Sequence, residues 1–507
     1  MTGSPVSRLR RVLSGIGRLI TAVFVLALAA GLVLAASWRP PASPGAIEPM
    51  QIDVGAAPLT LVCPPAPVLP TGDGGDLDYD DQFDTAGETT LADLGVVLGR
   101  DGAEPEPATG GSIGTGGSAI PAVGSLRLLT TEDPEPLQLQ AEPSAQETAF
   151  AAGASLSRTD TGDLRGLTAA PCIVPTSSAW LVGGQTELGS SARLTLTNPG
   201  ETAATVTVQA WGSVGPVEPV TLALEPGGVS SVLLEAVTLE PRLGVHVSSE
   251  GGRFTASIQE TVLDGLVSQG SDVITAAADP STELHVGPIP VLADAGTAVL
   301  RLLNPGEEPA EVSIDVLAEG VSTLSGTDAL VIEPGTVADI ALDGIDEGTA
   351  ALRITSDQPV TGGALIVRQG GPSELDPDQS LAERAWLPAT DPAGHGLLAL
   401  PANGALVDEV ALALTNPGTE DQTVAVHTVD ADGQRSGPVE IRIPAGSTTG
   451  LGDLDVNGAV AVDISGTQVL ATATLSATTD QGTMVGLLPM TPDAHSDQSV
   501  TVHVGTN

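Results

Sequence analysis

The 507-residue chain has no lysine, only two cysteines and very few aromatic residues, which make up 2% of it. Hydrophobic residues still account for 41%, so real cores can form, and this composition argues against global disorder. With so few rings, the cores must consist of Val, Leu, Ile and Ala, which suits thin β-sandwiches better than ligand-lined pockets. We therefore predict an all-β fold.

Positive charge is also scarce. The chain has 63 carboxylates against 18 basic residues, and its formal net charge is −45. A field of that sign repels phosphate backbones and anionic lipid. Nucleic acid is therefore not an expected partner.

The start of the chain predicts a membrane anchor. Residues 19–37 form an uncharged apolar run, close to the roughly 20 residues that cross a bilayer as a helix. Four arginines precede the run (Arg8, Arg10, Arg11 and Arg18), so the positive-inside rule places the N-terminus in the cytoplasm and the bulk of the chain outside. A signal peptide cleaved near Ala35-Ala36-Ser37 is the alternative. Both interpretations predict export.

Composition and spacing divide the chain into eight segments. We predict a basic cytoplasmic tail (1–18), a transmembrane signal-anchor (19–38), a proline-rich spacer (39–50), an irregular β domain (51–175), three β-sandwich repeats (176–281, 282–390 and 391–492) and a polar C-terminal tail (493–507). Within the irregular domain, the low-complexity stretches 71–88 and 104–121 are predicted to be disordered loops or linkers.

Three Asn-Pro-Gly turns mark the repeats. They are Asn198-Pro199-Gly200, Asn304-Pro305-Gly306 and Asn416-Pro417-Gly418. Apolar and polar residues alternate on both sides of each turn, as an antiparallel pair with one buried face requires. Pro followed by Gly fits a type II turn, in which Gly supplies the positive φ. About seven short strands per repeat, with no helical period, predict an immunoglobulin-like or fibronectin-like sandwich, with an eight-stranded jelly roll as the alternative.

The two cysteines predict a disulfide. Cys63 ends the apolar strand LTLVC, and Cys172 lies just before the first repeat. Both are on the predicted exported side, where disulfides persist, and two thiols allow only one intramolecular pairing. Two free thiols or an intermolecular bond are the alternatives.

No constellation of residues predicts catalysis, a cofactor or a metal. The acidic run contains Asp73, Asp76, Asp78, Asp80, Asp81 and Asp84. It resembles the start of an EF-hand loop, but Asp81 replaces the turn glycine and Gly87 stands in place of the final Glu, so a solvated loop is the favoured interpretation. The histidines are His246, His285, His395, His427, His495 and His503, and they show no metal-ligand spacing.

One G-x-S-x-G sequence is present, from Gly110 through Ser112 to Gly114. A nucleophile elbow needs a strand before the serine and a helix after it, and these flanks predict a flexible linker instead. The tryptophans Trp180, Trp211 and Trp386 are too few and too dispersed to predict a lectin. Trp180 and Trp386 lie near repeat boundaries, where we expect them to pack at domain entries.

Several motifs together resemble a known family. They are LTLVCPP at Cys63, APCIVP at Cys172, AWLVGG at Trp180 and LTLTNPG at Asn198. The combination is similar to a family of actinobacterial exported proteins with an N-terminal membrane anchor, catalogued as a domain of unknown function. Residues 179–181, Ala-Trp-Leu, have fewer aromatics than the family pattern. The resemblance implies a cell-envelope setting and supplies no activity.

The architecture predicts a non-enzymatic envelope scaffold, a rod of sandwiches that presents surfaces to other proteins or to cell-wall glycan. Two alternatives stay open. One is an accessory subunit or enzyme of envelope polysaccharide assembly, with a site between domains. The other is an acidic, cation-binding surface protein.

Overall fold

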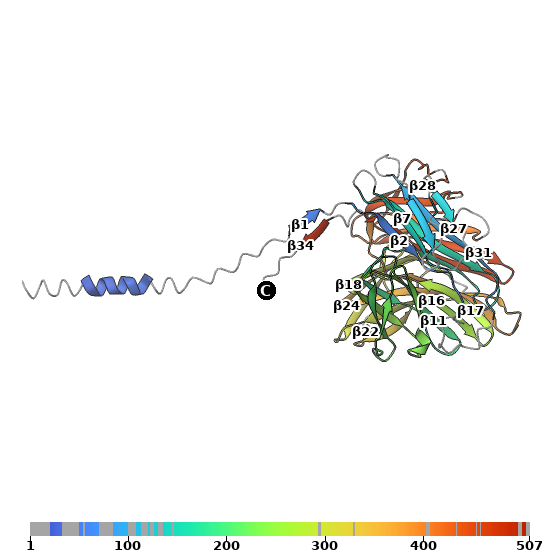
Figure 1. Cartoon of the computed structure of the whole chain (residues 1–507), viewed down its shortest axis with the longest axis horizontal. Coiled ribbons are helices and arrows are strands. Elements are labelled where there is room, and N and C mark those ends of the chain that lie inside the picture. Colours follow the sequence, from blue (N-terminus) through green and yellow to red (C-terminus); the bar gives the residue numbers. More distant parts are fainter. Residues whose placement is uncertain are drawn as a thin grey trace, which may run out of the picture. The chain divides into compact units, whose positions relative to one another are not determined.

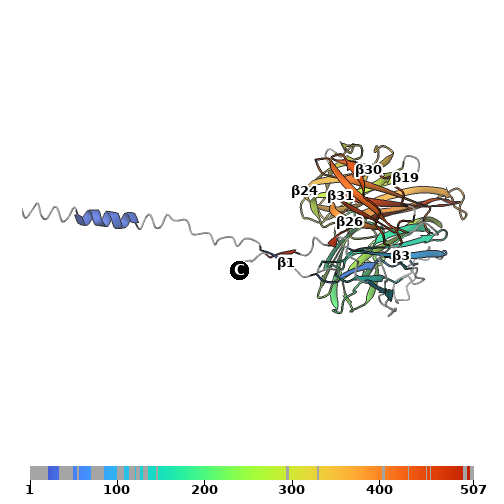
Figure 2. The ribbon, with the colours of Figure 1, turned by 90° about the horizontal axis from the view of Figure 1, so that it is seen from above.

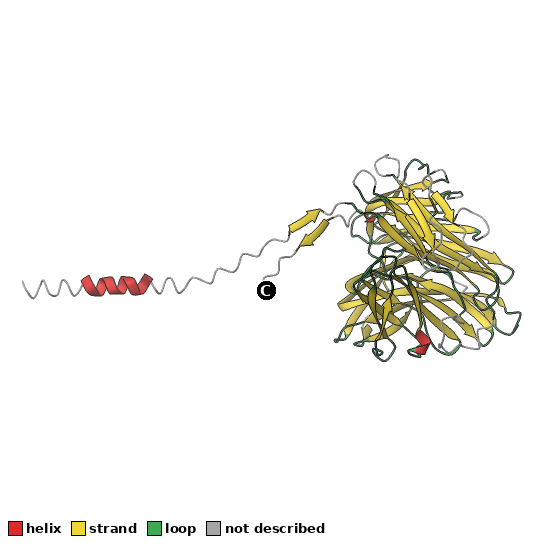
Figure 3. Cartoon of the chain, in the orientation of Figure 1, coloured by secondary structure: helices red, strands yellow, loops and turns green. Residues whose placement is uncertain are grey.

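The computed structural model describes most of the chain. The described residues are 21–32, 50–53, 56–69, 85–99, 108–112, 120–121, 126–129, 135–143, 147–292, 296–327, 330–401, 406–431, 433–452, 454–456, 458–494 and 499–502. They fall into two units, one formed by residues 1–54 with 499–507 and the other by residues 55–498. Figure 3 shows that strands dominate the larger unit.

The smaller unit contains a helix and a two-stranded ribbon. Residues 21–32 are helical, within the segment predicted to be an anchor. The described part of the chain contains no helix that is long and apolar enough to cross a membrane. Strands β1 (Met50–Asp53) and β34 (Ser499–Val502) pair antiparallel and form one ribbon.

The larger unit consists of four sandwiches with one strand order. If the strands of a sandwich are numbered 1 to 8, one sheet has the order 1-6-3-4 and the other 5-2-7-8. Sandwich 2 has β10 (Ser178–Val182), β11 (Ser190–Thr197), β12 (Ala204–Trp211), β13 (Val220–Leu224), β14 (Val229–Leu233), β15 (Gly244–Glu250), β16 (Thr255–Asp264) and β17 (Val267–Ile274), with the short helix η1 (Leu234–Ala236) after β14.

In sandwiches 3 and 4 one long strand, β24 (Gly348–Pro372) or β31 (Ala461–Thr479), fills positions 6 and 7. Sandwich 3 has β18 (Ser281–Val291), β19 (Gly296–Asn304), β20 (Ala310–Leu317), β21 (Val321–Thr323), β22 (Leu330–Ile332), β23 (Thr336–Ala341), β24 and β25 (Ser380–Pro388). In sandwich 3 two short strands, β21 and β22, together fill position 4. Sandwich 4 has β26 (Ala393–Ala399), β27 (Glu409–Asn416), β28 (Gln422–Val429), β29 (Val439–Ile443), β30 (Ser447–Gly450), β31 and β32 (Gly482–Pro489), and β33 (Thr491–Pro492) then pairs with β26.

The strand order departs from that of a constant-type immunoglobulin domain at strands 1, 4 and 7, and strand 4 pairs with strand 3 instead of strand 5. The pairs 2–5 and 3–6 match the immunoglobulin B–E and C–F pairs. Strand 7, however, pairs with strand 2 instead of strand 6, and strand 1 takes the place beside strand 6. In sandwiches 3 and 4 the long strands β24 and β31 pass from one sheet to the other, as strands at sandwich corners can. This crossing places strand 7 in the sheet opposite strand 6.

The predicted irregular domain is a fourth copy of the same sandwich. Sandwich 1 has β2 (Leu59–Cys63), β3 (Thr89–Leu98), β4 (Ala108–Ser112), β5 (Ile120–Pro121), β6 (Leu126–Leu129), β7 (Leu137–Ala141), β8 (Phe150–Thr159) and β9 (Gly166–Pro171). Its sheets again have the orders 1-6-3-4 and 5-2-7-8. The linker expected over 104–121 is therefore wrong for β4 and β5, because β4 pairs with β7 along its length.

The four sandwiches close into a ring through their eighth strands. Strand β9 contacts β17, β17 contacts β25, β25 contacts β32, and β32 contacts β9. Figures 1 and 2 show the result, with sandwich 1 beside both sandwich 4 and sandwich 2. The extended rod expected from the sequence is not the observed arrangement.

Glycine permits the close approach of strands in this ring. A Cβ on Gly270 of β17 would lie 2.8 Å from the backbone nitrogen of Arg384, and one on Gly486 of β32 would lie 2.9 Å from the carbonyl oxygen of Leu167. Real Cβ atoms essentially never come that near, so a side chain at either position would push two sandwiches apart.

The Asn-Pro-Gly turns are built differently from the prediction. Gly200, Gly306 and Gly418 lie outside the left-handed region, so these are not type II turns. The asparagine side chain makes the turn instead: its Oδ1 accepts the glycine N–H at 3.0 Å in all three copies, an Asx turn. Left-handed glycines instead recur about thirty residues further on, at Gly227, Gly335 and Gly446, in the turn between strands 4 and 5 of each repeat.

Each of these asparagines also ties the two sheets of its sandwich together. Asn304, which is fully buried, donates from Nδ2 to the carbonyls of Glu308 at 2.8 Å and Ile332 at 3.0 Å. Ile332 ends strand 4, which lies in the opposite sheet. Asn198 and Asn416 make the equivalent bonds to Leu224 and Ile443.

Candidate functional site

The main candidate site is a cavity where the four eighth strands end. Its volume is about 1030 Å³, and it is lined by Pro171, Thr275, Pro388 and Pro489, which end or directly follow β9, β17, β25 and β32. The linkers that leave these strands complete the wall. Because every sandwich contributes, the cavity exists only when the ring is closed.

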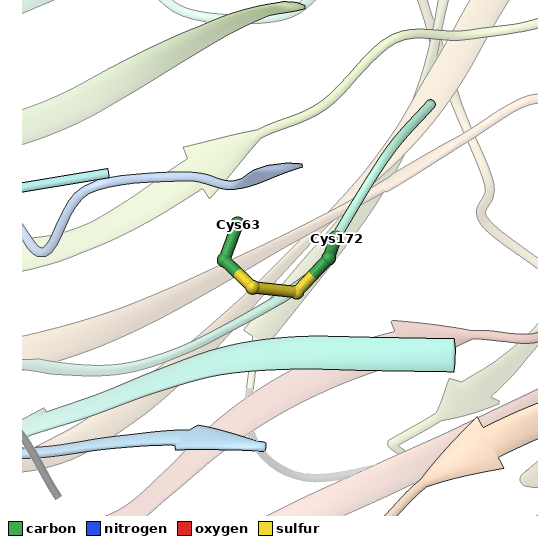
Figure 4. The surroundings of a disulfide bond; sticks show 2 residues. All are labelled: Cys63 and Cys172. Carbon is green, nitrogen blue, oxygen red and sulfur yellow. A yellow bond between two sulfur atoms is a disulfide. The ribbon is translucent and has the colours of Figure 1, made fainter. Parts of the chain in front are cut away.

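The disulfide forms part of this wall. Cys63 and Cys172 are bonded, which confirms the predicted pairing, and Figure 4 shows the bridge between the two segments. Ile173, the next residue, exchanges two backbone hydrogen bonds of 2.9 Å with Val62. The bridge thus fixes the first inter-sandwich linker, whose residues Ile173 and Val174 line the cavity, against strand β2.

A histidine held between two carboxylates is the centre of the polar wall. His395 Nε2 lies 2.8 Å from Asp463 and Nδ1 lies 3.3 Å from Asp493. Arg435 also reaches Asp463, at 3.1 Å. The Phe150 ring packs against the imidazole, with the ring centroids 4.2 Å apart. The cluster therefore joins sandwich 1 to sandwich 4 and to the C-terminal segment.

The electrostatics of the cluster keep His395 protonated. Burial lowers its pKa, but hydrogen bonds to Asp463 and Asp493 outweigh that effect and raise the pKa to about 9. Both ring nitrogens then donate to carboxylates. An imidazole in this state cannot accept a proton at neutral pH, so it is poorly suited to general-base catalysis.

A second charged cluster lies inside the ring. Arg165, directly before β9, pairs with Glu383 of β25, and both side chains are 1% exposed. Next to it, Glu260 accepts the indole N–H of Trp386 at 2.7 Å and lies 2.8 Å from Arg384. Burial raises the pKa of Glu383 to about 7 although Arg165 lowers it. These charges hold sandwiches together and do not reach the cavity wall.

The other predicted histidines do not gather. His246 stacks on Trp180 at 4.1 Å and contacts Ser178, while His427 donates to the carbonyl of Ser436. His285 is buried, and burial lowers its pKa. His495 and His503 lie outside the described residues. In the described part of the chain, no group of three or more His, Cys, Asp or Glu residues could hold a metal ion.

Two of the tryptophans come together, unlike the sequence prediction. Trp180 and Trp211 stack with centroids 5.6 Å apart, and they pack against Leu303 and Val337 of sandwich 3. Trp386 is buried between sandwiches 2 and 3. The rings therefore pack at sandwich boundaries.

Two predicted features cannot be located fully. The acidic run from Asp73 to Asp84 lies outside the described residues. Of the G-x-S-x-G sequence, Gly110 and Ser112 belong to strand β4, while Gly114 is outside the described part.

The sequence contained a faint signal for the polar cluster. The segments VHVS, LRIT and VDIS recur once in each repeat, and they align His246, Arg353 and Asp463, so each repeat places a polar residue at the same point of strand 6. His395, Asp463 and Asp493 are far apart in the chain, and no local spacing joins them. The pairing of β26 with β31 and with β33 brings them to one place within sandwich 4.

Comparisons with known proteins give a family but no activity. No curated protein sequence matches the chain. Among solved structures, a Streptomyces avermitilis α-L-rhamnosidase complexed with L-rhamnose aligns at 9% identity and a TM-score of 0.12, covering 75% of this chain and 54% of the enzyme. The chain thus spans about half the length of that enzyme.

The tetra-tandem repeat from the extending region of a large adhesion protein aligns at 12% identity and a TM-score of 0.10, covering 86% of this chain and all of that one. Scores this low carry no argument. A family model matches residues 129–453, from the end of the fifth strand of sandwich 1 into sandwich 4. The chain therefore belongs to the family of unknown function DUF5719.

Proposed function

We propose that the protein is a non-enzymatic, membrane-anchored component of the cell envelope whose four-sandwich unit binds an extracytoplasmic partner in its cavity. The observation that carries this proposal is the construction of the cavity from all four eighth-strand ends. A volume of about 1030 Å³ is at the upper end of what ligand sites occupy. The partner is an envelope protein or a cell-wall glycan.

Location outside the membrane is supported by two features. The Cys63–Cys172 bond belongs to an oxidising compartment. The apolar run at 19–37, preceded by four arginines, supports a single-pass signal-anchor with a cytoplasmic N-terminus. The family resemblance to anchored actinobacterial exported proteins agrees with both.

The alternative is an enzyme of envelope polysaccharide assembly, and one feature favours it. Asp391, Asp463, Asp493 and Glu147 bring four carboxylates to one cavity. The state of the cluster favours binding over catalysis, however, because Asp463 and Asp493 are committed to a protonated His395. A glycan-hydrolysis assay in which Asp391→Asn abolished turnover would establish the enzyme instead.

The proposal is tested by blocking the cavity in the full-length chain. Val174 is 48% exposed on the cavity wall, so Val174→Trp adds a bulky ring without burying it in a core. Leu188→Trp is the matched control, because Leu188 is 87% exposed and is not part of the cavity wall. We expect envelope components to co-purify with the wild type and the control but not with Val174→Trp. Equal recovery with both variants would refute the cavity as the binding site.

The orientation is tested separately. A C-terminal reporter that is active only outside the membrane should work, whereas one that is active only in the cytoplasm should not. Activity of the cytoplasmic reporter would refute the proposed topology.

A further inference from the structure

The charges of the cavity wall indicate which ligand it fits. Among the described lining residues, the charged side chains are the carboxylates Glu147, Asp391, Asp463 and Asp493 and the cations His395 and Arg435. Both cations are already paired with Asp463, at 2.8 Å and 3.1 Å. The wall therefore keeps an excess of negative charge, within a chain whose net charge is −45.

Prolines reduce the number of backbone hydrogen-bond donors in the wall. Five prolines line it, namely Pro171, Pro388, Pro392, Pro489 and Pro492. A proline keeps its carbonyl oxygen but has no N–H, so each one adds an acceptor without a donor. Ile173, Val174 and Met490 add apolar surface between these groups. Such a wall complements a guest that has only donors, a positive charge and an aliphatic part.

We infer that the cavity binds a basic group, an ammonium or guanidinium on an aliphatic stem, presented by a peptide segment or by a free small molecule. This inference rests on the proposed function and names the ligand class. Lysine and arginine side chains carry three and five donors and no acceptor. Their methylene stems pack on apolar surface while the charged head stays among polar groups. The acidic field of the whole chain also attracts such a guest.

The test is a titration of the full-length chain in detergent at low salt. The probes are a blocked pentapeptide, Ala-Ala-Arg-Ala-Ala, the same peptide with Glu in place of Arg, and N-acetyl-arginine amide. We expect saturable binding of the arginine peptide, none of the glutamate peptide, and weakening by salt. If N-acetyl-arginine amide binds as tightly as the pentapeptide, the guest is a free small molecule, and if it binds much more weakly, the guest is a peptide.

Matched variants separate the cavity from the acidic surface. Asp391→Asn should lower the affinity for the arginine peptide by about three- to five-fold, which corresponds to the loss of one exposed ion pair. Asp343→Asn removes an exposed carboxylate outside the cavity wall and should change nothing. Equal effects of the two variants, or equal binding of the arginine and glutamate peptides, would overturn the inference. If no basic probe binds while Val174→Trp still loses its partner, the ligand class is wrong and the proposed function stands.

Discussion

Sandwich 1 and sandwich 3 share one strand order but are stabilised by different means. The core of sandwich 3 lies almost wholly within that sandwich and takes in only Val485 and Leu487 of β32 among the described residues, and the buried Asn304 ties its two sheets together. In sandwich 1 the core between the sheets is smaller and includes Cys63 and Cys172. The other face of its β3–β8 sheet packs into one cluster with sandwich 4.

A glycine in strand β8 leaves space for the disulfide in sandwich 1. A Cβ on Gly153 of β8 would lie 2.6 Å from the sulfur of Cys172, so the strand must carry glycine there. The sequence of sandwich 1 contains no Asn-Pro-Gly turn. The comparison shows that a covalent bond and a neighbouring sandwich can stabilise a topology that other copies hold with a buried side chain.

Removing the disulfide should have the largest effect. In the double variant Cys63→Ser with Cys172→Ser, the chain loses a bond between residues 109 positions apart. Closing a loop of that size stabilises the folded state by about 4–5 kcal/mol in the chain-entropy model. We expect hydrogen exchange to accelerate in β2 and β7 far more than in β18 and β20. Equal loss of protection in both sandwiches would break the comparison, and two reactive thiols in the denatured, unreduced wild type would rule out the bridge.

Titration of Glu383 should have the next largest effect, at the contact between sandwiches 1 and 3. Burial raises its folded pKa from 4.5 to about 7, so its contribution to stability is present below pH 4.5 and is lost as the pH rises through 7. The free energy of unfolding should fall by about 3 kcal/mol over that range. Glu383→Gln should remove this part of the slope in denaturation curves measured from pH 4.5 to 8. A variant that keeps the wild-type slope would show that other groups cause it.

Asn304→Ala should act within sandwich 3 and spare sandwich 1. It leaves the carbonyl of Ile332 buried without its donor, which costs about 2 kcal/mol. Urea denaturation should show the loss, and hydrogen exchange should rise in β19 and β20 but not in β2. Asn304→Asp keeps the acceptor for Gly306 and loses the donors, so a stability equal to that of the wild type would mean that the inter-sheet bond contributes nothing.

The smallest effect is expected at His395, which joins the two end sandwiches. Its folded pKa is raised from 6.5 to about 9, so the stabilisation is present below pH 6.5 and disappears as the pH rises through 9. Because the side chain is 36% exposed, solvent screening limits the contribution to about 1 kcal/mol. Imidazole NMR shifts should titrate near pH 9 in the wild type and move toward 6.5 in Asp463→Asn. A titration midpoint near pH 6.5 in the wild type would contradict the stabilisation of protonated His395 by Asp463 and Asp493.

Sequence reasoning succeeded where the signal is local. Alternating apolar residues predicted the strands, and two cysteines with one possible pairing predicted the bridge. The fourth sandwich, in residues 51–175, was not recognised from the sequence because this segment lacks Asn-Pro-Gly and contains long inserts. The turn geometry was missed because Pro-Gly indicates a backbone turn, whereas the Asn304 side chain makes the bonds.

The ring and the cavity could not be predicted from the sequence. Arg165 and Glu383 look like surface residues in sequence, and only the contact between β9 and β25 buries them together. His395 and Asp463 lie 68 residues apart and meet through the pairing of β26 with β31. Both pairs depend on contacts between residues far apart in the chain, which no period or local motif encodes.

The contact of β9 with β32 sets the order in which the protein can mature. Sandwich 1 is synthesised first, yet one face of its β3–β8 sheet packs against residues of sandwich 4, such as Leu397 and Leu488. At ordinary translation speeds the intervening chain takes on the order of tens of seconds to appear. Until then an apolar sheet face is open to aggregation, so we expect a chain of this design to depend on chaperones more than a string of independent domains would.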